Sequence, residues 1–361
     1  MALRCGLARL RHILARLLGV LGVLGVLGLL GAGHGEELLS WILLPLLGTA
    51  AGGDRDTSVA PLVLLGPNDL MLPNTEACQP RAPFLLVLVA SAPAHVGHRE
   101  AIRRSWGGAR RASGYPVRTL FVLGLPDSGA EQAALEREAQ QHGDLVQGRF
   151  HDTYANLTIK TCMLLRWAAA LCPGAAFVAK VDDDIFLNLP ALAHHLGSLA
   201  NPHGLYLGRV HWWVRPNRDP HSRYHVPVAV FAGAAFPPYC SGTAYVLSGD
   251  AVRQVLVAVP HLVAVGPEDV FVGRCAHRAG LAPTHTARMG GAIRLSLDAC
   301  CYGQVLFSIH GVQPAQMGHV WGLLGGHGWG EGPEEPTGLC TLLQWGLGLL
   351  RCKVLALFEK L

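Results

Sequence analysis

The chain has 361 residues, of which 50% are hydrophobic and 15% charged, and its formal net charge is +4. Four arginines at positions 4, 9, 11 and 16 carry this excess, since the first 32 residues hold no acid and the remaining 25 basic and 25 acidic residues balance. A neutral main domain has no general basic field, which argues against nucleic acid as a partner.

The first predicted element is a membrane anchor over residues 13–32, behind a cytosolic tail over residues 1–12. Its apolar run, with Arg16 reaching back to the interface, has about the 20 residues that span a bilayer. Arginines before the run and Glu36-Glu37 after it predict a single-pass type II protein whose remainder is lumenal. A cleaved signal peptide is the alternative, with Ala32-Gly33 as its cleavage site.

Residues 33–83 are rich in Gly, Pro and Leu without a sustained period, and they predict a stem. Of the ten cysteines, all except Cys5 fall on the predicted lumenal side, where disulfides form. Their pairing cannot be read from the sequence, and the absence of a CxxC pair argues against a zinc site. Asn156-Leu157-Thr158 is the glycosylation acceptor triplet.

Strand and helix patterns alternate along the predicted lumenal domain, residues 84–338. Strands are expected at 84–89, 117–124 and from 177, and helices at 98–106, 129–142 and 157–171. This alternation predicts βαβ units, an α/β fold and a largely parallel sheet. The apolar segment 339–361 contains Arg351 and Lys353, and it packs as a helix or lies on the lumenal membrane surface.

Asp182, Asp183 and Asp184 end the predicted strand that begins at 177, and apolar residues follow at once. Three adjacent carboxylates in an apolar setting repel one another and are costly to desolvate. A hard divalent cation such as Mn²⁺ or Mg²⁺ removes that cost, whereas the plainer interpretation is a solvated acidic turn. The dinucleotide, P-loop and GxSxG signatures are absent from the sequence.

Six sequence blocks stand in an order that resembles the β-1,3-galactosyltransferase family, glycosyltransferase family 31. They are REAIRRSWG at 99–107, FVLG at 121–124, DTYANLTIKT at 152–161, KVDDDIFLN at 180–188, YCSGTAYVLS at 239–248 and PEDVFVG at 267–273. Within the family the chain looks closest to its ganglioside-synthesising branch. Four further blocks indicate this: GEELLS at 35–40, LYLGRVHWWVRPNRDP at 205–220, LDACCYG at 297–303 and LLRCKVLA at 349–356.

The resemblance implies a GT-A-like, Rossmann-like α/β glycosyltransferase domain in the Golgi membrane. It implies UDP-galactose as donor and a glycolipid ending in N-acetylgalactosamine as acceptor, joined in β-1,3 linkage. Other glycosyltransferases are expected as further partners, in complexes with this chain. By resemblance Asp184 ligates the metal, Asp182 and Asp183 lie nearer the ribose and sugar of the donor, and His310 completes the metal site.

Transfer also needs a general base, because the acceptor hydroxyl loses its proton as it attacks. Asp269, a carboxylate between apolar residues, is the candidate by resemblance, and Glu268 is the alternative. Both acids could instead cap a helix that begins near Val270. One displacement on the face opposite UDP inverts the anomeric centre, so no second nucleophilic carboxylate is required.

The remaining candidates contact the two substrates. Arg99, Arg103 and Lys160 are expected on the uridine and diphosphate of the donor, because phosphate recognition favours cations with several donors. On the acceptor side, Gly242 lets backbone approach a ligand closely. The other acceptor candidates are aromatic: Trp212, Trp213 and Tyr239. Residues 222–227 (SRYHVP) depart from the Lys-Trp-Tyr run of many family members, which puts acceptor contacts there in doubt.

Two other functions fit the same sequence. The family shares its motifs across donors, so transfer of N-acetylglucosamine is one alternative. A catalytically silent, membrane-anchored glycan-binding protein is the other, although the acidic motifs and the Arg99/Arg103 pair are intact. A glycolipid hydrolase is disfavoured, because the acids cluster at one turn rather than as two separated carboxylates.

Overall fold

The computed structural model describes residues 69–264, 267–292, 300–324 and 348–353, with short pieces at 35–37, 39–40 and 42–43. The predicted anchor and cytosolic tail lie outside these residues, as do most of the stem and most of the segment 339–361. Within the described part, no helix is long and apolar enough to cross a membrane.

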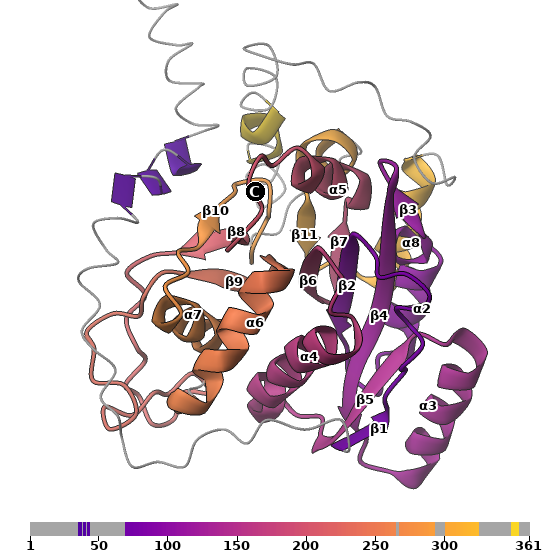
Figure 1. Cartoon of the computed structure of the whole chain (residues 1–361), viewed down its shortest axis with the longest axis horizontal. Helices are drawn as coiled ribbons and strands as arrows, with labels where there is room; N and C mark the ends of the chain where they lie inside the picture. Colours follow the sequence, from indigo (N-terminus) through magenta and orange to yellow (C-terminus); the bar gives the residue numbers. More distant parts are fainter. Residues whose placement is uncertain are drawn as a thin grey trace, which may run out of the picture.

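A mixed sheet forms the centre of the domain, with strand order β1-β5-β4-β2-β6-β9-β8-β10 and the short β3 beside β4 (Figure 1). Four neighbours, β5, β4, β2 and β6, are parallel, whereas β9 is antiparallel to both β6 and β8. The strand bounds are β1 Leu70–Leu72, β2 Leu85–Ala90, β3 Arg111–Ala112, β4 Tyr115–Leu125, β5 Leu145–His151, β6 Phe177–Asp182, β8 Tyr206–His211, β9 Tyr239–Ser248 and β10 Thr284–His285.

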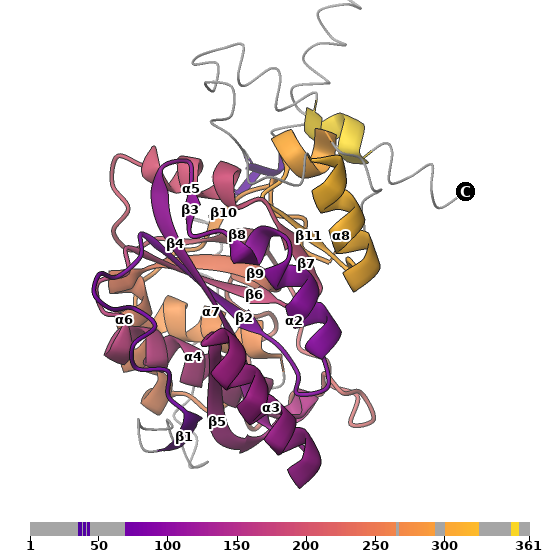
Figure 2. The same ribbon diagram turned by 90° about the vertical axis from the view of Figure 1, so that its right-hand side faces the viewer.

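Helices cover both faces of this sheet, and this favours nearly continuous apolar runs in its central strands. Leu86 and Leu88 of β2 face one core, and Leu85, Val87 and Val89 face the other. The first core packs against α4 Leu157–Leu171, α6 Gly249–Ala258 and α7 Glu268–Arg278. The second includes α2 Val96–Arg103, α3 Gly129–His142, α5 Leu189–Gly197 and α8 Pro314–Leu323, and Figure 2 shows α2 and α3 on this side.

The helices expected at 129–142 and 157–171 have the expected bounds, and the α/β architecture is confirmed. Two features differ from expectation. The sheet is mixed, because β8 and β9 are joined by residues 212–238 without a crossover helix, and antiparallel neighbours need none. The folded domain also starts before residue 84, since β1 pairs with β5.

Two disulfides fasten outlying segments to the domain. Cys78–Cys172 holds the segment between β1 and β2 against the end of α4, and Cys301–Cys352 holds the helical turn at 348–353 against the chain before β11, Ser308–His310. Among the described residues, these are the two pairings that the sequence left open. Cys162 and Cys240 are buried thiols.

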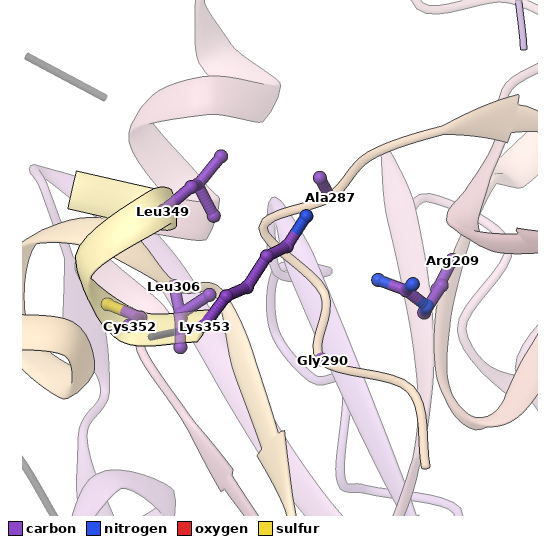
Figure 3. Close-up of a pocket in the computed structure, with 7 residues that line it drawn as sticks. All are labelled: Arg209, Ala287, Gly290, Leu306, Leu349, Cys352 and Lys353. Carbon is purple, nitrogen blue, oxygen red and sulfur yellow. The ribbon is translucent and has the colours of Figure 1, made fainter. Parts of the chain in front are cut away.

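A second attachment joins the piece at 35–37 to the domain. Glu36 lies 3.2 Å from Arg209 of β8 and 2.9 Å from Lys353. These two cations also line the small pocket of Figure 3, together with Ala287, Gly290, Leu306, Leu349 and Cys352. None of the predicted site residues lines this pocket, which lies where the helical turn at 348–353 meets the rest of the domain.

Candidate active site

The switch in strand order falls between β2 and β6. After β2 the chain adds β4 and β5 on one side, then returns to place β6 on the other side. Ala90 at the end of β2 is therefore in register with Asp182 at the end of β6. Ligands of open α/β sheets bind at the carboxyl ends of strands beside such a switch, and the acidic turn occupies this position.

Asp183 is buried and faces the loop that follows β2. Its Oδ2 accepts a hydrogen bond from Ser91 Oγ at 2.6 Å and lies 2.9 Å from His95 Nδ1. Lys160 of α4 donates to the Ser91 carbonyl at 2.7 Å and to Asp152 Oδ1 at 2.6 Å. Burial lowers the pKa of Lys160, and the Asp152 carboxylate opposes that shift. The predicted donor residues Asp183 and Lys160 therefore meet at one loop.

Arg99 and Arg103 lie behind this loop in a dense ion-pair cluster. Arg99 is fully buried and donates two 2.7 Å hydrogen bonds to Glu138 of α3. Its Nη1 also donates to the Ala92 carbonyl at 2.6 Å, which holds the loop in place. Arg103 pairs with Glu138 at 2.6 Å and with Asp144 at 2.8 Å. The guanidinium groups expected on the donor are thus engaged by protein carboxylates.

Asp184 and His310, 126 positions apart in the sequence, are brought together by a two-stranded ladder. β7, Ile185–Leu187, pairs with β11 so that His310 stands opposite Ile185. Asp184 Oδ2 lies 3.2 Å from His310 Nε2, with the two side chains 30% and 26% exposed. Burial opposes ionisation of Asp184, but the hydrogen bond and charge of His310 lower its pKa below the ordinary value.

This pair fits a divalent cation. Carboxylate oxygen and imidazole nitrogen both suit Mn²⁺, and a two-residue set leaves positions for water and substrate phosphates. No three His, Cys, Asp or Glu side chains converge as a full ligand set within the described ranges. A hard cation that shares its shell with a donor diphosphate needs few protein ligands.

Lys180, inside β6, connects the acidic turn to the base region, by which we mean the two predicted bases Glu268 and Asp269. Its Nζ lies 2.7 Å from Asp182 Oδ1 and 2.7 Å from Glu268 Oε1, and it also donates to the Gly242 carbonyl. Glu268 is almost fully buried at the start of α7. Burial raises its pKa to about 7, the charge of Asp269 adds to this, and Lys180 opposes it.

Asp269 is the more accessible of the two predicted bases. Its Oδ2 accepts a hydrogen bond from the Gly242 N–H at 2.9 Å, and its Oδ1 accepts one from Val270 N at 2.8 Å. Gly242 allows this approach, because a Cβ there would lie 2.8 Å from Glu268 Oε1 and 3.2 Å from the Asp269 carboxylate. The predicted acceptor residue Gly242 thus belongs to the base region.

The three predicted aromatic acceptor residues differ in how exposed they are. Tyr239 is buried with its ring 5.3 Å from the His211 ring, and burial, then the Asp269 charge, raises its pKa. Trp213 is 63% exposed with φ +57°, whereas Trp212 packs into the domain with its ring 4.9 Å from His285. Trp213 is the most exposed of the three.

Several residues of this region were missed in the sequence. Ser91 and His95 hold Asp183, and Asp152 holds Lys160 beside the loop after β2. Lys180 contacts both Asp182 and Glu268. The residues that these four side chains contact lie between 2 and 92 positions away in the sequence. Lys180 stands two residues before Asp182, and only this short spacing could have suggested a contact in advance. The predicted glycosylation residue Asn156 lies just before α4 and donates to the His151 carbonyl at 2.9 Å.

Comparison with known proteins identifies the family of the chain. The galactosyltransferase family model matches residues 97–287. Beta-1,3-galactosyltransferase 4 of Mus musculus is 41% identical over 91% of this chain and 93% of its own length. A Homo sapiens acetylgalactosaminyl-O-glycosyl-glycoprotein beta-1,3-N-acetylglucosaminyltransferase is 39% identical over 67% of this chain and 66% of its own.

A solved mannosyltransferase from Pyrobaculum calidifontis, in complex with GDP-Man and Mn²⁺, is 15% identical with a TM-score of 0.29. The match covers 68% of this chain and 66% of the length of the mannosyltransferase. A similarity this weak carries no argument about the site. The family model and the curated relatives do decide the family. The chain belongs to the β-1,3-galactosyltransferase family, glycosyltransferase family 31, and is a glycosyltransferase.

Proposed function

We propose that this enzyme transfers galactose from UDP-galactose to the terminal N-acetylgalactosamine of a ganglioside, with inversion, forming a β-1,3 linkage. The observation that carries the proposal is the position of Lys180, which contacts both the acidic turn and Glu268. A donor site and a base region are therefore held on one buried framework. Relatives named beta-1,3-galactosyltransferase 4 support the sugar and the linkage.

On the donor side, the loop after β2 and the acidic turn hold the nucleotide sugar. Asp184 and His310 would hold a Mn²⁺ or Mg²⁺ ion, which when bound offsets the negative charge of the departing diphosphate. Asp183 is fixed by Ser91 and His95, and the Asp183 carboxylate is thereby oriented before the donor arrives. We assign the domain to the GT-A type on this placement of an acidic turn at the sheet switch.

On the acceptor side, Asp269 serves as the general base. Its carboxylate is oriented by two backbone N–H groups and is partly accessible, whereas Glu268 is buried and occupied by Lys180. Asp269 accepts the proton of the acceptor hydroxyl while that oxygen attacks the anomeric carbon and UDP leaves from the opposite face. Glu268 then acts through Lys180 as a positioning residue.

We further propose a Golgi enzyme with a type II anchor over residues 13–32, since the sequence there has the length and flanking charges of a signal anchor. Glycosylation at Asn156 and association with other glycosyltransferases belong to the same proposal. An anchored domain suits a membrane-embedded glycolipid acceptor.

The test is a transfer assay with the full-length chain in detergent micelles with Mn²⁺, using UDP-galactose or UDP-N-acetylglucosamine. The acceptors are glycolipids that end in N-acetylgalactosamine. Galactose transfer that disappears in Asp269→Asn supports the proposal. Transfer of N-acetylglucosamine instead assigns the activity of the human relative. Glycolipid binding without transfer of either sugar contradicts the proposal and indicates a silent binding protein.

A further inference from the structure

Arg223 is an exposed cation in the connection between β8 and β9, held against two tyrosine rings. Its guanidinium carbon lies 4.9 Å from the ring centre of Tyr154 and 4.7 Å from that of Tyr224, and it donates a hydrogen bond to Tyr224 Oη. Over the described ranges, no carboxylate lies within ion-pair distance of this guanidinium. Most of its N–H donors therefore have no protein acceptor there.

The segment that carries Arg223 is fixed from within. Arg218 donates to the carbonyls of Val226 at 2.6 Å and Phe231 at 2.8 Å, and Val226 N donates to the Asn217 carbonyl at 2.8 Å. These hydrogen bonds fix the backbone of residues 217–226, which carries Arg223. Such preorganisation reduces the entropy lost when a ligand binds.

The turn of residues 217–226 lies beside the site: the Tyr224 ring centre is 6.3 Å from that of Tyr154, and Asp152, two residues before Tyr154, accepts the hydrogen bond from Lys160. Tyr154 precedes α4, and its pKa is raised to about 12 by burial, by a hydrogen bond with Tyr224 and in part by the charge of Asp269. The same charge acts on Tyr224. An acidic acceptor approaching Asp269 would be repelled, since like charges disfavour one another. A cation between the two tyrosines offsets that repulsion.

We propose that Arg223, held between Tyr154 and Tyr224, binds the carboxylate of an acidic sugar on the acceptor. This inference rests on the proposed function and deepens it: the enzyme prefers acceptors with an acidic branch over neutral ones with the same terminal N-acetylgalactosamine. A guanidinium suits this role, because it binds carboxylate through two parallel hydrogen bonds and stacks on aromatic rings. Residues 222–227, where the chain departs from the family run, thus gain a function of their own.

The experiment compares kcat/KM for two glycolipids that differ only in the acidic sugar, using the full-length enzyme in neutral detergent. Arg223→Gln should lower the acidic-to-neutral ratio about tenfold, with the neutral acceptor changed less than about twofold. Arg223→Lys should retain part of the preference, since it keeps the charge but not the planar fork. Arg253→Gln, an exposed arginine on α6, is the matched control and should change nothing.

A ratio that stays the same in Arg223→Gln overturns the inference while leaving the proposed function intact. If the wild-type enzyme transfers galactose to neither glycolipid, the proposed function fails instead. The inference is then judged by calorimetric binding of the two free oligosaccharides to the wild type and to Arg223→Gln. Equal Kd values for the acidic and neutral sugars in the wild type would overturn it.

Discussion

Lys180 Nζ lies 2.7 Å from Glu268 Oε1, and both side chains are more than nine-tenths buried. The pair crosses from β6 to the first turn of α7, so a cation in a strand fixes an acid at the start of a helix. Breaking a buried pair leaves one charge uncompensated, which costs about 3–5 kcal/mol, whereas replacing both members is often close to neutral.

Lys180→Met should therefore lower the free energy of unfolding by about 3 kcal/mol and reduce kcat/KM by at least about 100-fold. Denaturant unfolding and a galactose-transfer assay measure the two effects. The double variant Lys180→Met/Glu268→Met should recover most of the stability without activity. Full activity in either variant would show that this pair has no part in positioning the site.

Titration of Glu268 should make stability fall as pH rises towards neutrality. Its folded pKa of about 7 lies above the ordinary value of 4.5, so its contribution is fully present below pH 4.5 and lost as pH rises through 7. The contribution is about 3 kcal/mol at most. Glu268→Gln should flatten the stability profile between these pH values. A profile identical to that of the wild type would contradict the raised pKa.

Asp184→Ala and His310→Ala should each reduce galactose transfer by at least about 100-fold while leaving thermal unfolding within a few degrees of the wild type. The expected cause is loss of the cation site, so both variants should also weaken Mn²⁺-dependent binding of UDP in calorimetry. Chelator treatment of the wild type should abolish transfer, and added Mn²⁺ should restore it. His319→Ala, an exposed histidine on α8, is the control.

Substitution of Arg99 should lower the free energy of unfolding more than it weakens donor binding. Arg99→Met leaves the Glu138 carboxylate without its fully buried partner, and we expect a loss of about 3 kcal/mol in unfolding free energy. Arg104→Met should cost less than about 0.5 kcal/mol, since Arg104 is 78% exposed and pairs with Glu100 at the surface. An Arg99→Met protein of normal stability with a raised KM for UDP-galactose would favour direct donor contact instead.

Gly242→Ala tests the close approach of β9 to α7. A Cβ at this position would lie 2.8 Å from Glu268 Oε1, so either the carboxylate or the strand must shift. We expect kcat to fall about tenfold to 100-fold, because small displacements of catalytic groups are costly. The cost in thermal stability should be modest. Unchanged kcat would mean that the contact between β9 and α7 accommodates a Cβ without displacing the Asp269 carboxylate.

Two helices and the strand that delivers the aspartates could be predicted, because runs of helix-forming or apolar residues, bounded by turn residues, are local signals. Residues 129–142 and 157–171 show this most clearly. The antiparallel β9 could not be distinguished from a parallel strand, since both are apolar runs when buried on two faces. Sheet order decides that question, and it depends on contacts distant in sequence.

The same distinction applies to the site. The acidic turn and its proximity to His310 followed from motif resemblance, and the structure brings Asp184 and His310 together. Arg99 and Arg103 were placed on the donor because cations suit phosphate, yet their partners Glu138 and Asp144 lie 35 to 41 residues away. Charge alone does not reveal which anion, protein or ligand, a cation meets.

The disulfide between Cys301 and Cys352 joins two segments that lie 51 positions apart in the sequence. Cys301 lies nine positions before His310, so this cross-link anchors the stretch of chain that leads into β11. The strand that carries His310 therefore depends on a cysteine far from it in the sequence and on conditions that oxidise thiols. A substitution of Cys352, which on a linear map lies far from every predicted site residue, would loosen that strand.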